Sequence, residues 1–203
     1  RLLPAIEVVR FGAGYGLLVC FMYTYALLQE RAGAMLRYHS DHDALSNCLN
    51  RRTFNEALDQ VARRRGADAR CTFLLIDIDH FKSINDQHGH LVGDRVITQV
   101  AATLGRELDP GTPLFRYGGE EFAVMLIDAG EPDGVALAER LRGAVAGTDF
   151  QGISVTVSVG VAEWRAPLGT LDAALGRADV ALYAAKRAGR NRVVGESLAS
   201  AAA

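Results

Sequence analysis

Two aspartates follow an apolar run and could bind a divalent metal ion. Residues 72–78 form an apolar segment typical of a strand buried on both faces, with Asp77 near its end and Asp79 directly after it. Carboxylates at positions i and i+2 point to the same side if the strand continues. Asp79 could instead cap a helix that begins near Phe81. Because capping does not explain Asp77, Asp77 is the better candidate for a metal ligand.

A turn between two strand-like segments combines two glycines with two acids, in the order Gly118, Gly119, Glu120 and Glu121. Glycines allow backbone conformations closed to other residues and leave room for a ligand against the main chain. The ordinary alternative is a surface turn with two solvated glutamates. If the strand that carries Asp77 lies beside this turn, the acids form a pair that could hold Mg²⁺. In proteins Mg²⁺ takes one or two carboxylates together with phosphate oxygens, which suits a nucleoside triphosphate site.

Polar residues downstream of Asp77 could bind the rest of such a nucleotide. Lys82 lies five residues after Asp77, close enough to contact phosphates bound there. Asn85 and Asp94 could bind the edge of guanine, since a carboxylate accepts from its N1–H and amino groups and an amide can meet its acceptors. Each also has an ordinary interpretation, Asn85 as a helix cap and Asp94 as an acid at a helix N-terminus.

The last predicted helix ends with two cations. Lys186 and Arg190 are four residues apart, which would place both on one helical face. Their ordinary role is a favourable interaction with the negative end of the helix dipole. They could bind phosphates if this helix end faces the glycine turn. The sequence contains no G-x-S-x-G nucleophile elbow, no Walker A loop and no Rossmann glycine fingerprint.

The elements that must position these residues alternate between helical and strand-like patterns. Helical periodicity predicts helices over residues 50–65, 91–107, 132–146 and 170–188. Apolar runs and alternation predict strands over residues 72–78, 113–117, 121–127, 153–161 and 192–194, with a half-buried strand at 153–161. This order indicates an α/β or α+β fold with a mixed sheet that includes a hairpin around the glycine turn.

The N-terminal region differs in composition from the rest. Residues 11–28 are 18 residues without a charge, and a helix of that length spans roughly 27 Å, just enough for a bilayer core. Gly12 and Gly16 form a G-x-x-x-G step that lets two membrane helices approach closely. We expect a membrane span, with a helix buried against other protein as the alternative, and a short polar helix or linker over residues 29–42. The chain begins at Arg1, so we expect a piece of a longer protein.

Composition excludes several classes. The 203 residues suit one domain of about 150–170 residues with an appendage. A net charge of −2 argues against a large nucleic-acid surface, so no nucleic acid is expected as a partner. Three cysteines, far apart and with no C-x-x-C pair, exclude a disulfide framework and a cysteine zinc site and fit a reducing compartment.

Several of these motifs together resemble one family, the GGDEF diguanylate cyclases, over residues 41–195. The family's name motif corresponds to Gly118-Gly119-Glu120-Glu121-Phe122, in its GGEEF form. The other blocks are Asp77-Ile78-Asp79-x-Phe81-Lys82-x-x-Asn85-Asp86, His88-Gly89-His90-x-x-Gly93-Asp94, Ser158-Val159-Gly160-Val161 and Ala178-Asp179-x-Ala181-Leu182-Tyr183-x-Ala185-Lys186-x-x-Gly189-Arg190-Asn191. Blocks in this order and spacing are far more specific than any one of them.

The resemblance implies a palm-like nucleotide-cyclase fold, with a mostly antiparallel sheet wrapped by helices and preceded by an N-terminal helix. It implies that two GTP molecules form cyclic di-GMP and two pyrophosphates in a homodimer with Mg²⁺. The implied metal ligands are Asp77, the Ile78 carbonyl, Glu120 and Glu121. The implied catalytic residues are Glu120, Glu121 and Lys82. The implied substrate-binding residues are Phe81, Lys82, Asn85, Asp94, Gly118, Gly119, Lys186 and Arg190.

The expected organisation is an N-terminal helix that forms a transmembrane segment, with a linker, over residues 1–42, a GGDEF catalytic domain over 43–196, and a disordered tail over 197–203. With such an anchor the protein would lie at the inner membrane, with the catalytic domain in the cytoplasm. The alternatives are a catalytically silent GGDEF domain that senses GTP or cyclic di-GMP, and a membrane-anchored dimerisation module.

The chain departs from the family pattern at two places. In the opening motif, Asn47 replaces a glycine and Cys48 replaces a larger leucine; Asn47 can adopt a left-handed conformation in glycine's place. The family's inhibitory Arg-x-x-Asp is absent at its usual spacing. A literal match at Arg106 and Asp109 comes three residues too early, so we expect no inhibitory site.

Overall fold

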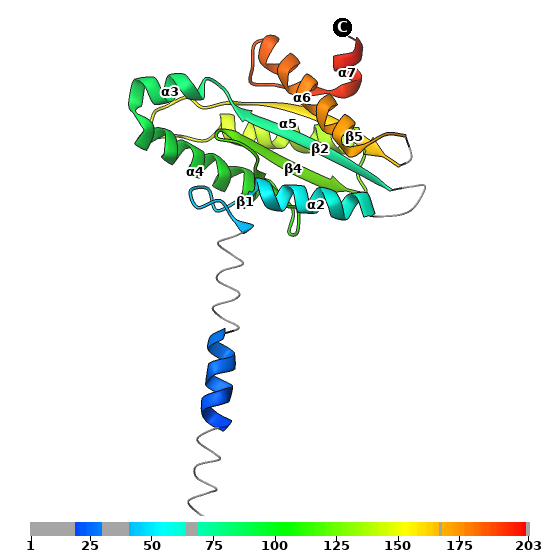
Figure 1. Ribbon diagram of the computed structural model, residues 1–203. Coiled ribbons are helices and arrows are strands. Elements are labelled where there is room, and N and C mark those ends of the chain that lie inside the picture. Colours follow the sequence, from blue (N-terminus) through cyan, green and yellow to red (C-terminus); the bar gives the residue numbers. More distant parts are fainter. Residues whose placement is uncertain (1–18, 30–40, 64–68, 167, 202–203) are drawn as a thin grey trace, which may run out of the picture. The chain divides into compact units, whose positions relative to one another are not determined.

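The computed structural model describes residues 19–29, 41–63, 69–166 and 168–201. The chain divides between Asp41 and His42 into two units, and the second contains the sheet. The elements, labelled in Figure 1, are β1 (Leu49–Asn50), α2 (Arg51–Arg63), β2 (Arg70–Ile78), α3 (Phe81–His88), α4 (His90–Glu107), β3 (Leu114–Arg116), β4 (Glu121–Ile127), α5 (Glu131–Ala146), β5 (Val157–Arg165), α6 (Leu171–Arg187), β6 (Val193–Gly195) and α7 (Glu196–Ala201).

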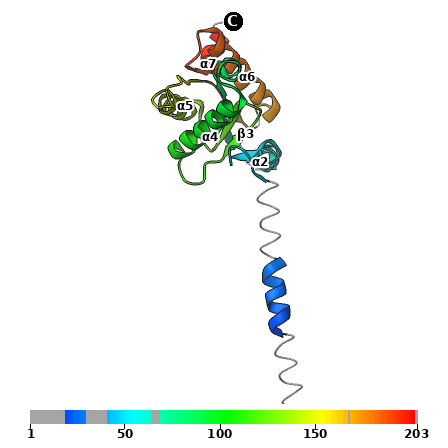
Figure 2. The same ribbon diagram turned by 90° about the vertical axis from the view of Figure 1, so that its left-hand side faces the viewer.

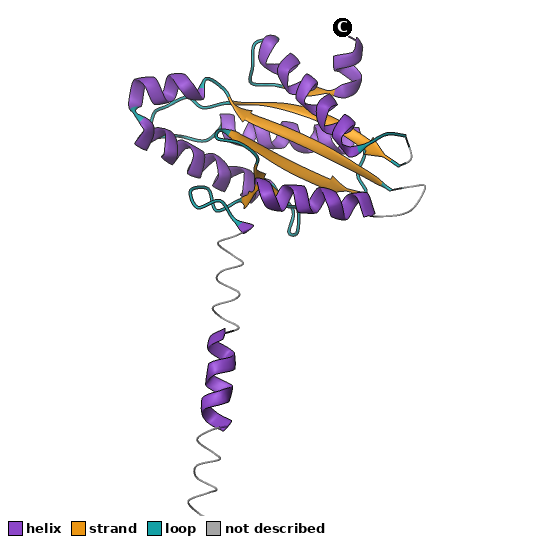
Figure 3. Ribbon diagram, in the orientation of Figure 1, coloured by secondary structure: helices purple, strands orange, loops and turns teal. Residues whose placement is uncertain are grey.

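The sheet has six strands in the order β1-β3-β4-β2-β5-β6 (Figure 3). The three central pairings, β3 with β4, β4 with β2 and β2 with β5, are antiparallel, while β1–β3 and β5–β6 are parallel. The predicted mixed, mostly antiparallel sheet is therefore confirmed, as is the hairpin of β3 and β4 around the glycine turn. β2 lies at the centre, so its ends are positioned by a strand on either side.

Helices cover both faces of the sheet (Figure 2). On one face Leu74, Ile76 and Ile78 of β2 pack in a cluster with α3, α4 and α5. On the other face Phe73 and Leu75 pack in a second cluster with α2 and α6. Because both faces of β2 are buried, its sequence is a continuous apolar run rather than an alternating one.

The prediction of a half-buried strand over residues 153–161 is wrong. β5 begins at Val157 and is buried on both faces as far as Trp164. Of the polar residues that produce the alternation, Ser154 is exposed and precedes β5, whereas Thr156 is half-buried and Ser158 is buried. The last two have an internal partner, because both hydroxyls donate to the carboxylate of Asp79. A buried hydroxyl with an acceptor costs far less than one without.

α6 packs directly onto the backbone of β5. A Cβ atom at Gly160 would overlap the α6 backbone at Ala178 and Leu182. The helix therefore lies closer to the strand than any other residue at this position would permit. Lys186 follows Leu182 by about one helical turn, so this contact also fixes the part of the helix that carries Lys186.

The end of the chain is a helix where the sequence predicted a frayed tail from residue 197. The backbone amide and hydroxyl of Ser197 donate to Glu131 at the start of α5, at 3.0 and 2.9 Å. The carboxylate of Glu196 accepts from Arg177 of α6 and from the backbone N–H of Glu163, the latter at 3.0 Å. These contacts hold α7 against the domain, and residues 202–203 lie outside the described residues.

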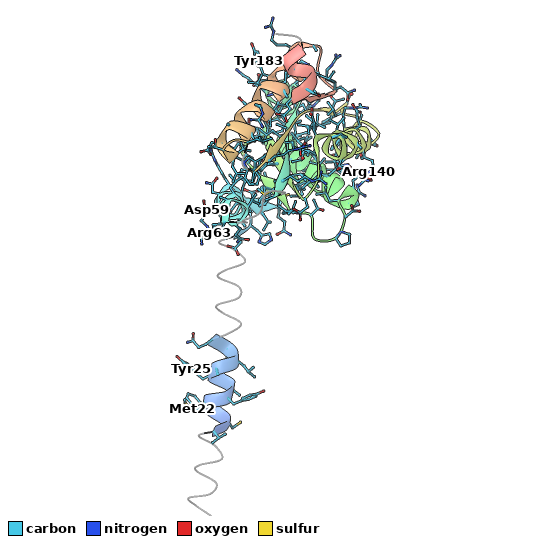
Figure 4. The ribbon with its side chains drawn as sticks, turned by 90° about the vertical axis from the view of Figure 1, so that its right-hand side faces the viewer. Met22, Tyr25, Asp59, Arg63, Arg140 and Tyr183 are labelled. Carbon is cyan, nitrogen blue, oxygen red and sulfur yellow. The ribbon has the colours of Figure 1, made fainter. Side chains whose placement is uncertain are left out.

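Residues 19–29 form a helix with exposed apolar side chains, among them Met22 and Tyr25 (Figure 4). Within the described part of the chain, no helix is both long and apolar enough to cross a bilayer. Residues 11–18 of the predicted span, with both glycines of its G-x-x-x-G step, lie outside the described residues, as do residues 30–40 of the predicted linker.

Candidate active site

The acids of the two strongest motifs meet at one edge of the sheet. Asp77 of β2 and Glu121 of β4 are directly opposite each other in the antiparallel pairing. The backbone N–H of Ile78 donates to the carbonyl of Glu120 at 3.3 Å. The prediction that the Asp77 strand lies beside the glycine turn is thus confirmed, and four proposed metal-binding residues gather where β2 ends.

Asp77 is buried and has one cationic partner. Its side chain lies among buried groups, with the residue only 4% exposed, and the ammonium of Lys186 donates to Oδ2 at 2.8 Å. Burial raises the pKa of Asp77 above its ordinary value, and the negative charge of Asp79 acts in the same direction. The hydrogen bond and charge of Lys186, and the charge of Arg190, oppose this rise without cancelling it.

Glu120 is half-buried at the glycine turn, and its pKa is raised as well. Burial raises its pKa, and the negative charges of Asp77 and Glu121 raise it further, while Lys186 acts in the opposite direction. Repulsion among these acids disfavours their ionised forms together. A bound cation would relieve that repulsion, so the electrostatics of this edge favour a positively charged ligand.

The oxygen donors here fit Mg²⁺. The carboxylates of Asp77, Glu120 and Glu121 and the carbonyl of Ile78 are hard donors of the kind Mg²⁺ prefers. Among the described residues, no three His, Cys, Asp or Glu side chains are arranged as a complete metal cluster. A complete cluster is not needed, because Mg²⁺ is commonly bound by one or two carboxylates together with substrate phosphates.

The glycine turn differs from the sequence interpretation. Neither Gly118 nor Gly119 has a positive φ, so the turn does not use a conformation reserved for glycine. At Gly118 the need is for space, because a Cβ would overlap the carboxylate of Glu121. Around Gly119 the space is open, so a Cβ there would meet no protein atom within 4 Å. Gly118 therefore makes room for an acid of the site, whereas Gly119 leaves room for a ligand.

Arg116 holds this turn, a role that was not predicted from the sequence. Its Nη2 and Nε donate to the carbonyl of Gly119 at 2.7 and 3.2 Å, and its Nη1 donates to Asp43 at 2.7 Å. Burial would raise the pKa of Asp43, but hydrogen bonds from Ser46 and Arg116 outweigh it and lower the pKa overall. Asp43 begins the opening motif that contains Asn47 and Cys48, but nothing in that motif indicates its partner, because Arg116 lies 73 residues further along the chain.

The proposed guanine-binding residues lie on α3 and α4. The side chain of Asn85 lies against Gly93, where a Cβ would overlap its Oδ1 and also approach the ring of Phe81. Phe81 is buried in the core cluster, whereas Lys82 and Asp94 are exposed. Phe81 therefore supports this region from within, and the exposed side chains are open to a ligand.

The ordinary interpretations of Asn85 and Asp94 are both wrong. The residues that flank α3 are His80, in the left-handed region with φ 55°, and Gly89, so Asn85 does not cap the helix with its side chain. α4 begins at His90 and has no acid in its first turn, so Asp94 lies inside the helix, after that turn. Neither residue is explained by helix termination, which strengthens the case that they bind a ligand.

Lys186 and Arg190 do not share a helical face, contrary to the prediction. α6 ends at Arg187, Gly189 has φ 112°, and Arg190 has φ 63° in the left-handed region. Both cations nevertheless act on Asp77, Lys186 by a hydrogen bond and Arg190 through its charge. The helix end does face the acids, as the phosphate interpretation requires.

A groove of about 300 Å³ lies between the site and α6. It is lined by Glu121, Asp179, Val180, Leu182, Tyr183 and Lys186. Tyr183 is exposed on the outer side of α6 (Figure 4). The groove places an apolar and aromatic surface next to Glu121 and Lys186.

Asp79 is not the helix cap that the sequence suggested. It is 4% exposed and accepts from the Thr156 hydroxyl, the Ser158 hydroxyl and the backbone N–H of Asn191, at 2.7, 2.7 and 2.9 Å. His80 precedes α3 instead, with no side-chain cap. Asp79 thus joins the end of β2 to β5 and to the loop after α6.

Comparison with known proteins identifies the family. Residues 40–192 match the family model described as "Diguanylate cyclase, GGDEF domain". The chain belongs to the GGDEF family. The response regulator PleD of Caulobacter vibrioides is 39% identical to this GGDEF protein over 184 residues, which is 83% of this chain and 40% of PleD. Diguanylate cyclase DgcM of Escherichia coli is 38% identical over 183 residues, which is 89% of this chain and 44% of DgcM.

Solved GGDEF structures share the fold. The coiled coil and GGDEF domain of DgcB from Caulobacter crescentus, in complex with c-di-GMP, superposes with a TM-score of 0.78 at 34% identity, covering 88% of this chain and 96% of that one. Diguanylate cyclase SiaD from Pseudomonas aeruginosa, in complex with its activator SiaC, has a TM-score of 0.70 at 31% identity over 95% of this chain and 78% of SiaD. The chain spans less than half the length of PleD and DgcM.

The departures in the opening motif of this GGDEF domain have a structural account. Asn47 has φ 59°, so the prediction that it adopts a left-handed conformation in glycine's place is confirmed. Cys48 is buried in the core cluster, and burial raises the pKa of its thiol. The side chain therefore serves as a small apolar group at the start of β1.

Proposed function

We propose that this GGDEF domain is a diguanylate cyclase that condenses two GTP molecules into cyclic di-GMP and two pyrophosphates. In each half-reaction the 3′-hydroxyl of one GTP attacks the α-phosphate of the other. A P–O bond forms to that hydroxyl oxygen, the bond to pyrophosphate breaks, and the hydroxyl proton is lost. Two such steps close the ring.

One observation carries this proposal: at the end of β2, buried Asp77 and half-buried Glu120 both have raised pKa values and lie near Lys186. Burial and the neighbouring negative charges disfavour the ionised forms of Asp77 and Glu120, and a bound cation would offset this. Mg²⁺ held by Asp77, Glu120, Glu121 and the Ile78 carbonyl would neutralise triphosphate charge and polarise the α-phosphate. Nucleoside triphosphates bind as complexes with Mg²⁺, so the substrate would bring the positive charge that offsets these carboxylates.

The remaining residues would orient the nucleotide. Lys186 and Arg190 would contact the phosphates from the end of α6 and the loop after it. Lys82, which is exposed at the start of α3, would contact the same phosphates from α3. Asn85 and Asp94 would bind guanine, because Asp94 accepts from donors that adenine does not offer at the same positions. We therefore expect Asp94→Ala to reduce discrimination between GTP and ATP.

Each domain would bind one GTP, so the reaction needs two domains facing each other. We expect specific activity to rise with enzyme concentration until pairing is complete. If residues 11–28 also span the inner membrane, they would raise the effective concentration of one domain at another, plausibly to the millimolar range. Fractionation of cells that express the full chain tests this placement, with the catalytic domain expected on the cytoplasmic side.

The test is an assay of the purified protein with GTP and Mg²⁺, with cyclic di-GMP as the measured product. Glu120→Gln and Glu121→Gln should each reduce turnover by about 10²-fold or more, because an amide cannot replace the charge of the carboxylate. Glu56→Gln, which changes an exposed acid on α2, is the matched control. Removal of Mg²⁺ with a chelator should stop product formation.

The competing function gives a different result. A silent domain would bind GTP or cyclic di-GMP by calorimetry but form no product at any enzyme concentration. Product formation at the wild-type rate by both glutamine variants would remove these glutamates from the chemistry.

A further inference from the structure

The loop after α6 has an unfavourable backbone conformation next to the proposed phosphate site. Arg190 has φ 63° and Asn191 has φ 45°, two consecutive residues other than glycine in the left-handed region. Such conformations cost on the order of 1 kcal/mol or more each and persist where surrounding contacts determine them. The contacts that hold this loop therefore decide where Arg190 lies.

The loop is anchored on three sides. The backbone N–H of Asn191 donates to Asp79 Oδ2 at 2.9 Å, and its side-chain oxygen accepts from Arg142 of α5 at 2.8 Å. The N–H of Arg190 donates to the carbonyl of Ala185 at 3.1 Å, which closes the end of α6. Of the three residues that anchor the loop, Asp79 is the one close to Asp77 in the sequence, because it follows Asp77 by two residues.

The three hydrogen-bond donors to Asp79 are neutral groups, two hydroxyls and one backbone amide. A buried carboxylate is costly unless its oxygens are satisfied, so its presence calls for a specific role. Among the described residues, Oδ1 accepts from Ser158 of β5, whereas Oδ2 accepts from both Thr156 and Asn191. The loop is therefore anchored at Oδ2, while Ser158 donates to the other oxygen.

We propose that Asp79 is a positioning residue: through the Asn191 amide it holds the loop after α6 in the conformation that keeps Arg190 beside Asp77. Asp79 contacts no substrate in this account. It acts through Arg190, which would bind the phosphates of GTP. The inference rests on the proposed function for the identity of that ligand.

A double-mutant cycle tests this with Asp79→Ala, Arg190→Ala and the double variant of the full chain. The primary measurement is the Kd of an α,β-methylene GTP analogue with Mg²⁺, with kcat and KM for GTP measured alongside. We expect each single variant to weaken binding by about tenfold, the effect of losing a hydrogen bond to a charged group. The double variant should match Arg190→Ala, because Asp79 has no further effect once Arg190 is gone.

The control is Ser158→Ala, which removes the donor to Oδ1 and leaves the loop anchor in place. We expect its Kd to stay within about twofold of wild type, even if its melting temperature falls as much as that of Asp79→Ala. If Asp79→Ala does not fold, Asp79→Asn replaces it in the cycle, because asparagine retains one acceptor oxygen but cannot accept at the other position.

Multiplicative losses in the double variant, or an equal loss of affinity in Ser158→Ala, would overturn the proposal and make Asp79 a purely structural residue. The outcome is separable from that of the proposed function. A wild-type protein that binds the analogue but forms no cyclic di-GMP would refute the cyclase activity, while the cycle on Kd would still decide the role of Asp79.

Discussion

Two buried carboxylates at opposite ends of the central sheet have opposite electrostatic character. Glu163, near the end of β5, is 8% exposed, and Asp77, near the end of β2, is 4% exposed. Burial alone would raise the pKa of Glu163, but hydrogen bonds from Arg165 and the Glu131 amide, with the charges of Arg165 and Arg70, lower it overall. At Asp77 burial prevails over Lys186 and Arg190, and the pKa is raised.

The difference distinguishes an acid that stabilises the fold from one that we propose binds a ligand. A lowered pKa means that ionised Glu163 stabilises the folded state at pH values above the unfolded pKa, and that this stability is lost as the pH falls through the folded pKa. A raised pKa means that ionised Asp77 costs stability at neutral pH, a cost relieved as the pH falls. Incompletely compensated acids of this kind are typical of functional sites.

The largest effect on turnover is expected from Asp77→Asn. The amide keeps the size of the side chain but removes its charge, so cyclic di-GMP formation should fall by about 10³-fold or more. The melting temperature should stay the same or rise, because an unfavourable buried charge is gone and Lys186 is partly exposed to water. If Asp77→Asn has near-normal turnover and a much lower melting temperature, Asp77 stabilises the fold, as Glu163 does, and does not bind a ligand.

A smaller effect is expected from Lys186→Met. Removing the ammonium removes a hydrogen bond and a charge that lower the pKa of Asp77, so that pKa should rise further. Asp77 would then become protonated at a higher pH, and the acid limb of the pH–rate profile should shift to higher pH. KM for GTP should also increase, by about tenfold.

Arg187→Met is the matched control for Lys186→Met. Arg187 lies next in the sequence but is exposed, with its guanidinium over the ring of Tyr183. Removing this guanidinium should leave the acid limb of the pH–rate profile at its wild-type pH. An identical shift in both variants would mean that the profile reports the general charge of α6 rather than Asp77.

The smallest effect on turnover is expected from Glu163→Gln. The free energy of unfolding, measured by urea titration at pH 7, should fall by about 1–3 kcal/mol, since hydrogen bonds to a buried charged group are lost. Turnover per folded molecule should stay within about twofold of wild type.

The pH dependence of Glu163→Gln sharpens this prediction. The difference in stability between the variant and wild type should shrink as the pH falls below the ordinary glutamate value of 4.5, because the wild-type carboxyl then becomes protonated as well. Glu139→Gln, an exposed acid on α5, should show no such difference. A constant difference across this range would mean that Glu163 acts through packing and not through charge.

Local patterns predicted most of this fold and the central part of its site. The apolar run of residues 72–78 identified β2 because both of its faces are buried, and the glycine turn identified the hairpin of β3 and β4. Asp77 stood out because an acid at the end of such a strand has no packing benefit. The residue types of Asn85 and Asp94 and the family resemblance both suggest guanine binding, which stays a prediction.

What the sequence did not predict depends on contacts between distant segments. Asp43 and Arg116 are 73 positions apart, and Asp79 and Asn191 are 112 apart. No periodicity encodes such pairs. The spacing of Lys186 and Arg190 is helical, but Gly189 ends the helix between them, so their proximity to Asp77 arises from the loop and not from a shared face.

The glycine contact between α6 and β5 limits how this domain can respond to a signal. Packed helices that slide during a conformational change do so by adjusting the side chains between them. At Gly160 no side chain separates the helix from the strand backbone, so there is nothing to adjust. The position of the α6 backbone on β5 is therefore fixed by this contact. If the domain acts as the proposed cyclase, we expect a regulatory signal to change how often two domains meet rather than the position of α6 within either of them.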